Sequence, residues 1–255
     1  MKDRLKDRRI IVFGGASGIG AAAVKRLVEE GARVCVADID LPGAEKTAEE
    51  AGGECFAVYV DLSEEASVNA AVEAAVSRLG GLDGAHINAA DMRAILQDSD
   101  ALAIDLAVFD RTIAVNLRGH LLCTRAVLPH LVKNAASAIV YTSSGAYVAG
   151  EPTRPAYAIS KAGINALMRH VAARWGKEGV TANALSPGLT LTRQLKAQLE
   201  VRAETWADDQ LAHLPHTRLG EPEDQAAVVA LLLSDDGRWI NGSVVSVDGG
   251  SIMRG

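Results

Sequence analysis

Residues 9–20 read RIIVFGGASGIG, and this stretch decides the fold. An apolar run of strand length, Arg9–Phe13, passes directly into Gly14-Gly15-Ala16-Ser17-Gly18-Ile19-Gly20, and a helical pattern follows. The first turn of a doubly wound α/β sheet needs glycine where the backbone approaches a pyrophosphate and where helix packs on strand. The helix after it directs its positive N-terminus at the phosphates. The stretch therefore predicts a dinucleotide-binding βα unit at the start of the chain.

Apolar runs of strand length alternate with helical patterns along the rest of the chain. The predicted strands are Arg9–Phe13, Arg33–Ala37, Glu54–Val60, Gly84–Asn88, Ala138–Thr142, Thr181–Leu185 and Ser243–Val247, and the predicted helices lie near 19–30, 41–51, 64–79, 105–133, 157–178 and 222–233. Most of these strands are near-continuous apolar runs, which is typical of parallel strands buried on both faces. The pattern predicts an α/β fold: a single doubly wound Rossmann-type domain, residues 1–255, with a seven-stranded parallel sheet and helices on both faces.

The composition excludes several classes of protein. The chain has 255 residues, of which 49% are hydrophobic, and a formal net charge of −6. No basic stripe runs along it, so nucleic acid is not an expected partner. The first ten residues lack the apolar region of a signal peptide and no segment approaches about 18 consecutive apolar residues, so we expect a cytoplasmic protein without a membrane span. Cys35, Cys55 and Cys123 lie far apart, which favours buried, reduced thiols over metal ligands or disulfides.

Capping signals mark several helix ends. Ser63, followed by Glu64 and Glu65, is predicted to open the third helix. Gly31, Gly52 and Gly80 follow predicted helix ends, where a residue in the left-handed conformation is favoured.

The segment 190–219 breaks the alternation. It carries a helical pattern of Leu195, Leu199, Trp206 and Leu211 but belongs to no obvious βα unit. A long insert after the carboxyl end of a strand is a candidate substrate lid. The alternative is an extra pair of packed helices.

Acidic residues end the second and third predicted strands. Asp38 can accept hydrogen bonds from the adenosine ribose hydroxyls and would repel a 2′-phosphate, and no Arg or Lys follows it directly, which favours NAD over NADP. The alternative is a solvated turn acid. Asp61, followed by Leu62, can meet the adenine amino group in the same way or can simply cap a helix.

Tyr157 and Lys161 stand four residues apart at the start of a predicted helix and share one face. A tyrosine with a pKa near 10 is a poor base at neutral pH, and a nearby ammonium favours the phenolate. Ser144 ends the preceding strand at the edge where ligands bind in such sheets, so its hydroxyl can polarise a substrate oxygen or merely belong to a turn. Tyr157 is the candidate general acid and base.

Asn116 interrupts an apolar helical pattern. Because a buried amide must be satisfied, it can hold a water that links Lys161 to solvent. The alternative is a local bend in the helix.

These residues together resemble the short-chain dehydrogenase/reductase family in its compact single-domain branch. The family motif T-G-x-x-x-G-x-G matches Gly14, Gly18 and Gly20, the N-N-A-G motif is represented by Ile87-Asn88-Ala89-Ala90, and P-G-x-x-x-T matches Pro187-Gly188-Leu189-Thr190-Leu191-Thr192. The Asn–Ser–Tyr–Lys tetrad falls on Asn116, Ser144, Tyr157 and Lys161, and Val247-Asp248-Gly249-Gly250 resembles the closing turn.

The resemblance implies roles for these positions. Lys161 would bind the nicotinamide ribose as well as tune Tyr157, and the chain would form a homotetramer or homodimer through the helices near 105–133 and 157–178. The implied catalytic residues are Asn116, Ser144, Tyr157 and Lys161; the implied cofactor-binding residues are Gly14, Ser17, Gly18, Ile19, Gly20, Asp38, Asp61, Leu62, Asn88, Ala89, Tyr157, Lys161, Pro187, Gly188, Leu189, Thr190 and Thr192, with no metal site.

Two departures from the family pattern matter. Phe13 stands where the family usually has Thr, so a hydroxyl that stabilises the glycine turn is missing. Ile87 and Ala90 replace the first Asn and the Gly of N-N-A-G, while Asn88 remains, so we expect cofactor binding to survive. The loop 90–104 carries Asp91, Asp98 and Asp100, and either shapes the substrate pocket or is only a solvated loop.

The expected function is hydride transfer between NAD(H) and a secondary alcohol or ketone, with a small-molecule substrate. One alternative is a non-catalytic NAD-binding protein that senses redox state or scaffolds a partner. A nucleotide-sugar epimerase also uses Tyr-x-x-x-Lys, but such chains carry a further substrate domain. Apolar positions in the lid and in the loops near the tetrad favour an apolar substrate, such as a steroid, a terpenoid, a cyclic secondary alcohol or an acyl chain.

Overall fold

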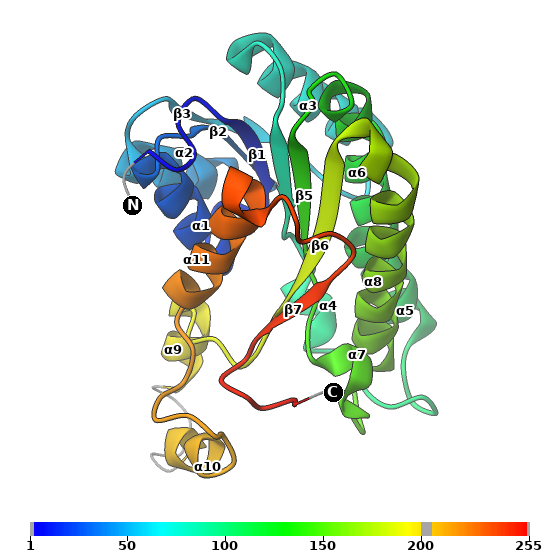
Figure 1. Ribbon diagram of the computed structural model, residues 1–255. Coiled ribbons are helices and arrows are strands. Elements are labelled where there is room, and N and C mark those ends of the chain that lie inside the picture. Colours follow the sequence, from blue (N-terminus) through cyan, green and yellow to red (C-terminus); the bar gives the residue numbers. More distant parts are fainter. Residues whose placement is uncertain (1–2, 200–205, 254–255) are drawn as a thin grey trace.

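The computed structural model describes residues 3–199 and 206–253, and within them it forms one parallel sheet (Figure 1). The strands are β1 (Arg9–Phe13), β2 (Arg33–Asp38), β3 (Cys55–Tyr59), β4 (Gly84–Ile87), β5 (Ser137–Thr142), β6 (Val180–Pro187) and β7 (Val244–Val247). They lie in the order β3-β2-β1-β4-β5-β6-β7, and every neighbouring pair is parallel. The predicted seven-stranded doubly wound sheet is confirmed.

The central strands owe their place to continuous apolar sequence. Every residue of β4 and of β5 is buried, as is every residue of β1 after Arg9. A parallel sheet is covered by helices on both faces, so neither face of such a strand needs polar side chains.

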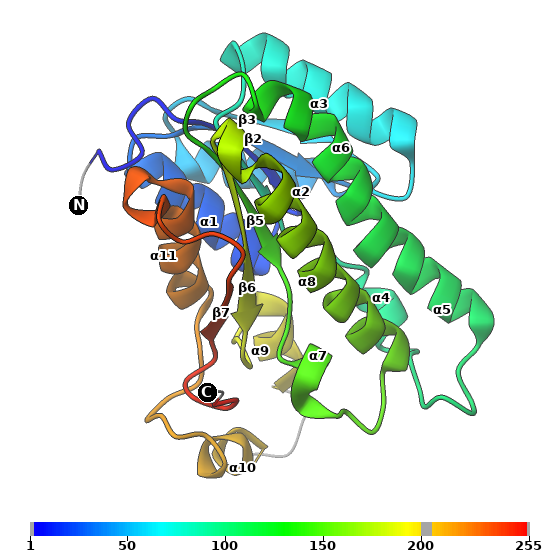
Figure 2. The same cartoon turned by 45° about the vertical axis from the view of Figure 1, so that its right-hand side comes forward.

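Helices cover the two faces of the sheet (Figures 1 and 2). One face is covered by α1 (Gly18–Glu29), α2 (Leu41–Ala51) and α11 (Pro222–Leu233), and the other by α3 (Glu65–Leu79), α5 (Leu106–Ile113), α6 (Gly119–Leu131) and α8 (Pro155–Trp175). Each layer has its own apolar core: Val24 and Val229 pack against one face of the sheet, and Val72 and Ile164 against the other.

The helix predicted over 105–133 is interrupted. A π-helical turn, η1 (Ala114–Arg118), separates α5 from α6, and Asn116 lies at its centre. Single π turns are frequent at functional sites because they redirect side chains within a helix. Shorter helical elements complete the chain: α4 (Met92–Ile95), α7 (Ala146–Ala149), η2 (Gly176–Glu178), α9 (Arg193–Leu199), α10 (Trp206–Ala212) and η3 (Asp235–Gly237).

The predicted helix ends are confirmed with one exception. Gly80 adopts the left-handed conformation after α3, and Gly31 and Gly52 also have positive φ after their helices. Ser63 does not cap α3, because its hydroxyl donates to Asp61 Oδ1 at 2.6 Å and the cap position belongs to Glu64.

The carboxyl ends of the strands meet at one edge of the sheet, where α4, α7 and α9 follow β4, β5 and β6 (Figure 1). The strand order reverses at β1, whose neighbours are β2 and β4. Ligands of doubly wound sheets bind in the crevice outside the carboxyl ends at such a switch point. The site is therefore expected between the ends of β1 and β4.

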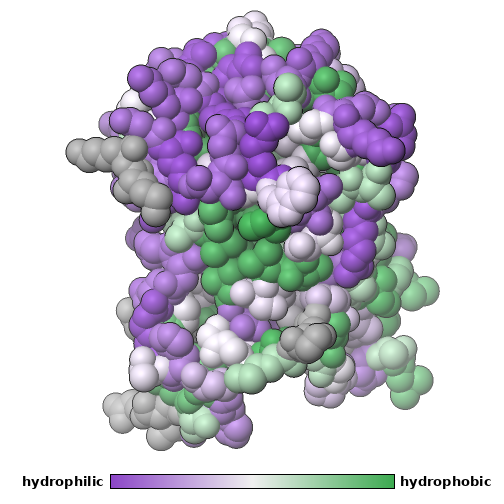
Figure 3. Space-filling model, viewed as in Figure 1, coloured by the Kyte–Doolittle hydropathy of each residue, from purple (hydrophilic) through white to green (hydrophobic). Residues whose placement is uncertain are grey.

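The surface around the edge strand β7 is apolar (Figure 3). Val244, Val245 and Val247 of β7 are only partly buried within the chain.

Among the described residues, no helix has the length and apolar character needed to cross a membrane. Cys35 and Cys123 are buried, whereas Cys55 is partly exposed; all three are free thiols.

Burial predicts that two isoleucines contribute differently to the free energy of unfolding. Ile139 on β5 is fully buried, whereas Ile39 is 55% exposed. We expect Ile139→Ala to lower the free energy of unfolding by about 2–5 kcal/mol, because it removes buried apolar contacts and leaves a cavity. The matched change Ile39→Ala should cost about 0.5 kcal/mol or less. Urea denaturation of both variants checks this, and equal losses would contradict the assignment of β5 to the core.

Candidate active site

The glycine-rich loop between β1 and α1 leaves no room for side chains. A Cβ on Gly14, which has a φ of 81°, would lie 2.7 Å from the Cα of Ala89, and a Cβ on Gly20 would lie 1.9 Å from the Gly14 carbonyl oxygen. Ser17, Gly18 and Ile19 complete the turn into the N-terminus of α1. The exposed backbone N–H groups of a helix start bind phosphate. This loop is therefore a cradle that fits the pyrophosphate of a dinucleotide.

The glycine-rich loop is held in place by other groups, because Phe13 has no side-chain hydroxyl to stabilise it. The Phe13 carbonyl accepts hydrogen bonds from the backbone N–H groups of Asn88 and Ala89, both at 3.0 Å. The Asn88 side-chain amide donates to the Gly14 carbonyl at 3.0 Å. The Phe13 side chain is fully buried in the core instead. Backbone bonds and Asn88 thus join the ends of β1 and β4.

Asp38 lies against the glycine-rich loop. Its carboxylate accepts from the backbone N–H of Ala16 at 2.9 Å and from that of Asp40 at 3.0 Å. The Asp38 carboxylate is therefore anchored beside the cradle. Asp61 instead closes a local turn, since its carboxylate accepts from both the N–H and the hydroxyl of Ser63.

Tyr157, Lys161 and Ser144 come together at the carboxyl edge of β5. Lys161 is 2% exposed, and its ammonium donates to the Thr142 carbonyl oxygen at 2.7 Å. The Lys161 Nζ atom lies 5.5 Å from the centre of the Tyr157 ring. Burial lowers the pKa of Lys161 to about 7.

The pKa of Tyr157 is shifted in the opposite direction to that expected. Burial raises the pKa of the phenol, and the hydrogen bond with Ser144 acts the other way without reversing it. The sequence argument took Lys161 as a full positive charge beside Tyr157. The expectation fails because the same burial that removes water from the phenol also disfavours the Lys161 ammonium.

Asn116 is fully buried in the π turn. Its side-chain oxygen accepts from the backbone N–H of Asp91 at 2.8 Å, and its Nδ2 has no partner among the described residues. Asn116 thus lies in a π turn that interrupts the regular α-helix. A buried amide donor of this kind is suited to hold a water.

Sequence reasoning missed a buried polar group beneath the site. The Thr142 hydroxyl donates to Asn88 Oδ1 at 3.0 Å and lies 3.0 Å from His86 Nε2. Burial lowers the pKa of His86 to about 3, so the ring is neutral. His86 lies on β4 and Asn88 follows directly after the strand, so their spacing of two residues is the signal in the sequence that could have linked them.

The segment that follows β6 lies over the cradle. Pro187 ends β6 and Gly188 and Leu189 lead to Thr190, which forms a β-bridge with Gly220. A Cβ on Gly18 would lie 3.2 Å from the Thr192 side chain, so Thr192 lies beside the glycine-rich loop. The predicted lid therefore begins next to the phosphate cradle.

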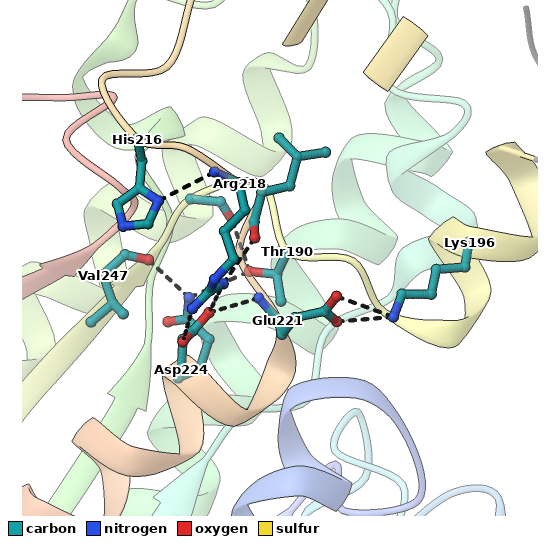
Figure 4. A network of polar contacts seen from close by, with 10 residues as sticks. Thr190, Lys196, His216, Arg218, Glu221, Asp224 and Val247 are labelled. Atoms are coloured by element: carbon teal, nitrogen blue, oxygen red, sulfur yellow. Dashed lines mark hydrogen bonds and ion pairs between the residues drawn. The ribbon is translucent and has the colours of Figure 1, made fainter. Parts of the chain in front are cut away.

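Two ion pairs tie the lid segment to α11 (Figure 4). Lys196 and Glu221 approach to 3.0 Å, and Arg218 holds Asp224 through two hydrogen bonds of 2.7 Å. The hydrogen bond with Arg218 lowers the pKa of Asp224 to about 2. Residues 200–205 and the side chain of Leu199, which the lid prediction includes, lie outside the described residues.

A pocket of about 460 Å³ lies between the lid and the closing turn 246–251. Leu214, Arg218, Gln225 and Asp248 line it, and none of the predicted tetrad residues does. Within the described part of the chain, no group of three or more His, Cys, Asp or Glu side chains forms a metal site.

Relatives of this chain are dehydrogenases and reductases. A family model described as enoyl-(acyl carrier protein) reductase matches residues 14–251. A probable short-chain type dehydrogenase/reductase of Bradyrhizobium diazoefficiens is 38% identical, over 98% of this chain and 89% of the relative. A 2,5-dichloro-2,5-cyclohexadiene-1,4-diol dehydrogenase of Sphingobium indicum is 36% identical over 96% and 97%. Levodione reductase of Leifsonia aquatica is 33% identical over 97% and 95%.

Solved structures share the fold. The 3-ketoacyl-(acyl-carrier-protein) reductase from Brucella melitensis, complexed with NADH, matches with a TM-score of 0.87 and 31% identity, over 97% of this chain and 100% of that one. A short chain dehydrogenase from Burkholderia cenocepacia, in complex with NADP, matches with a TM-score of 0.87 and 30% identity, over 97% and 99%.

The fold and the site define an oxidoreductase that uses a nicotinamide cofactor. The chain belongs to the short-chain dehydrogenase/reductase family, which confirms the resemblance seen in its motifs. It transfers a hydride between the cofactor and an alcohol or ketone substrate.

The buried lysine predicts how stability depends on pH. The folded-state pKa of Lys161 is about 7, against 10.5 for an unburied lysine. Between these pH values the unfolded chain binds more protons than the folded chain, so this group makes folding more favourable as the pH rises. Lys161→Met removes the linkage. The unfolding free energy of the wild type minus that of the variant should therefore rise by up to about 1.4 kcal/mol per pH unit above pH 7.

Chemical denaturation at intervals from pH 6 to pH 10 measures this difference. The exposed Lys177→Met variant is the control for loss of a lysine charge. A difference that stays flat between pH 7 and pH 10 would show that Lys161 keeps its charge in the folded protein.

Proposed function

We propose that the chain is an NAD-dependent dehydrogenase/reductase of secondary alcohols and ketones, with Tyr157 as the general acid and base. The observation that carries the proposal is the cluster of Tyr157, Ser144 and Lys161 at the carboxyl edge of the sheet, next to a glycine cradle that a single Cβ would fill. When bound, the nicotinamide ring supplies the hydride acceptor or donor. A sensor or scaffold would need no such reacting cluster.

Each tetrad side chain has one task in the oxidative direction. After its own proton has left, Tyr157 as a phenolate takes the proton from the substrate hydroxyl, and Ser144 hydrogen-bonds the substrate oxygen and the phenol oxygen. Lys161, whose pKa near 7 lets it gain and lose a proton at neutral pH, accepts the Tyr157 proton in its neutral form and passes it on. Asn116 holds a water with its unpaired Nδ2 and so extends the path toward solvent.

The preference for NAD rests on Asp38. Its carboxylate is held by two backbone N–H groups beside the cradle, and a 2′-phosphate there would be repelled by its negative charge. The predicted cofactor-binding set is otherwise neutral toward the choice, and solved relatives include one complex with NADH and one with NADP.

The substrate class we propose is a cyclic secondary alcohol or its ketone. Exposed apolar side chains stand on three segments at the carboxyl edge: Met92 on α4, Val148 on α7 and Leu189 before the lid. One relative is named 2,5-dichloro-2,5-cyclohexadiene-1,4-diol dehydrogenase, and another is named levodione reductase. An apolar rim around a polar tetrad suits a ring that carries one reacting oxygen.

We further propose a single domain with a lid at about 190–219, a homotetramer or homodimer, and a cytoplasmic location. The lid proposal is supported by Thr192 beside Gly18 and by the ion pairs to α11. The oligomer proposal is supported by the exposed Leu106, Leu121 and Ile159 on the helices α5, α6 and α8.

Replacing the proton donor tests the proposed chemistry. We expect Tyr157→Phe to lower kcat by about 10³-fold, because it removes the acid/base oxygen. Binding of NAD, measured by calorimetry, should stay within a few-fold of the wild type. Tyr59→Phe, at a half-exposed position on β3, is the control. Turnover that survives Tyr157→Phe would refute the role of this residue.

Removing the charge of Asp38 tests the cofactor preference. We expect Asp38→Asn to shift the ratio of the NADP and NAD dissociation constants toward NADP by about tenfold, because the amide keeps an acceptor oxygen and loses the repulsion. Asp40→Asn, which removes a charge two residues away, should leave the ratio nearly unchanged. A wild type that binds NADP more tightly than NAD, in the same calorimetric titrations, would overturn the assignment.

A further inference from the structure

The start of α8 is unusual for the helix that carries Tyr157. The first four backbone N–H groups of a helix have no partner within the helix and need one elsewhere. A side chain at the N-cap position commonly supplies it. Here the N-cap residue is Arg154, whose side chain makes no capping hydrogen bond within the described part of the chain and whose φ of 66° is unusual for a residue with a side chain.

A loop distant in the sequence supplies every missing partner. The Arg154 N–H donates to the Ser99 carbonyl at 2.7 Å, and Pro155 has no N–H to satisfy. The Asp98 carboxylate accepts from the N–H of Ala156 at 3.4 Å and from that of Tyr157 at 2.8 Å. The first intrahelical bond then runs from Ala158 to Arg154.

Asp98 is buried against the start of α8. It is 5% exposed, although it is a carboxylate, and the described residues offer it no ion-pair partner. A buried charge needs hydrogen bonds, and the positive end of a helix supplies both donors and a favourable dipole. Figures 1 and 2 both show the connection between α4 and α5 beside the N-terminal end of α8. The carboxylate and the helix start therefore depend on each other.

The same segment also contacts a second residue of the tetrad. The backbone N–H of Asp91 donates to the Asn116 side chain at 2.8 Å, and the Asp91 carboxylate holds Arg111. Between Asp91 and Asp98 lies the short helix α4, whose Ala94 and Ile95 are buried. The segment 91–99 thus spans from Asn116 to the backbone of Tyr157.

We propose that Asp98 is a positioning residue for catalysis: by accepting the Tyr157 N–H, it fixes the backbone of the acid/base residue and so the distance of its phenol from Ser144 and the substrate. The proposal rests on the function proposed above. Tyr157 lies in the first turn, where Asp98 holds its own N–H, so a shift of the helix start moves the phenol directly. A displacement of about 1 Å can cost about 10²-fold in rate.

The test compares three variants of the 255-residue chain: Asp98→Ala, Asp98→Asn and Asp100→Ala. Asp100 is the matched control, because it closes its own exposed turn on Leu102 and Ala103 within the same loop. With cyclohexanol and NAD as probes, or cyclohexanone and NADH, Asp98→Ala should lower kcat by about 10- to 100-fold and leave KM and NAD affinity within about threefold. Asp98→Asn should recover most of kcat, since its amide oxygen still accepts the Tyr157 N–H.

Hydrogen exchange gives a readout that needs no turnover. The amides of residues 156–161 should exchange faster in Asp98→Ala than in Asp100→Ala or Asp98→Asn. Equal exchange and equal kcat in Asp98→Ala and Asp100→Ala would overturn the proposal. If Asp98→Ala does not fold, an Asp98→Asn variant with strongly reduced kcat or with fast exchange at residues 156–161 would overturn it instead.

The acid/base role of Tyr157 and the positioning role of Asp98 can be refuted separately. Turnover by Tyr157→Phe would refute the acid/base assignment whatever Asp98 does. An inactive Tyr157→Phe variant together with a fully active Asp98→Ala variant would refute only the positioning role.

Discussion

The contact between Gly14 and Ala89 is the constraint on which the rest of the structure depends. With a Cβ, Gly14 would clash with the backbone of Ala89, so the close approach of the turn after β1 to the turn after β4 requires glycine at this position. That approach lets the Phe13 carbonyl and the Asn88 amide join the two strand ends. It also fixes the start of α1 over the switch point of the sheet, where the cofactor crevice of such folds lies.

Burial governs the chemistry of the site more than charge pairing does. Lys161 is buried, and desolvation favours the neutral form of both Lys161 and Tyr157. A lysine with a pKa near 7 can exchange protons under neutral conditions, which an ordinary lysine cannot do. The burial that weakens the expected ammonium–phenolate pair is therefore the basis of the role proposed for Lys161 in passing the proton on.

The fold could largely be predicted from the sequence, and so could the meeting of Tyr157, Lys161 and Ser144 at the edge of the sheet, because both depend on local patterns. The apolar runs of β4 and β5 specify buried parallel strands, and the spacing of Gly14, Gly18 and Gly20 specifies the cradle. The predicted direction of the pKa shift of Tyr157 was wrong, because this shift depends on how far folding removes water from the phenol. At Asn116 the sequence indicated an interruption of the helical pattern but not that a π turn forms there. The capping of α8 by Asp98, which lies 59 residues from Tyr157 in the chain, gave no local signal.

The central claim is that the carboxyl edge between β1 and β4 binds a nicotinamide dinucleotide next to Tyr157. Hydrogen-exchange mass spectrometry of the protein with and without NAD tests it most directly, and it requires no knowledge of the substrate. We expect NAD to protect the peptides that contain Gly14–Gly20, Asp38, Asn88–Ala89 and Pro187–Thr192, and to leave the distant end of the sheet unchanged. Protection confined to other segments, or no protection at saturating NAD, would contradict the account.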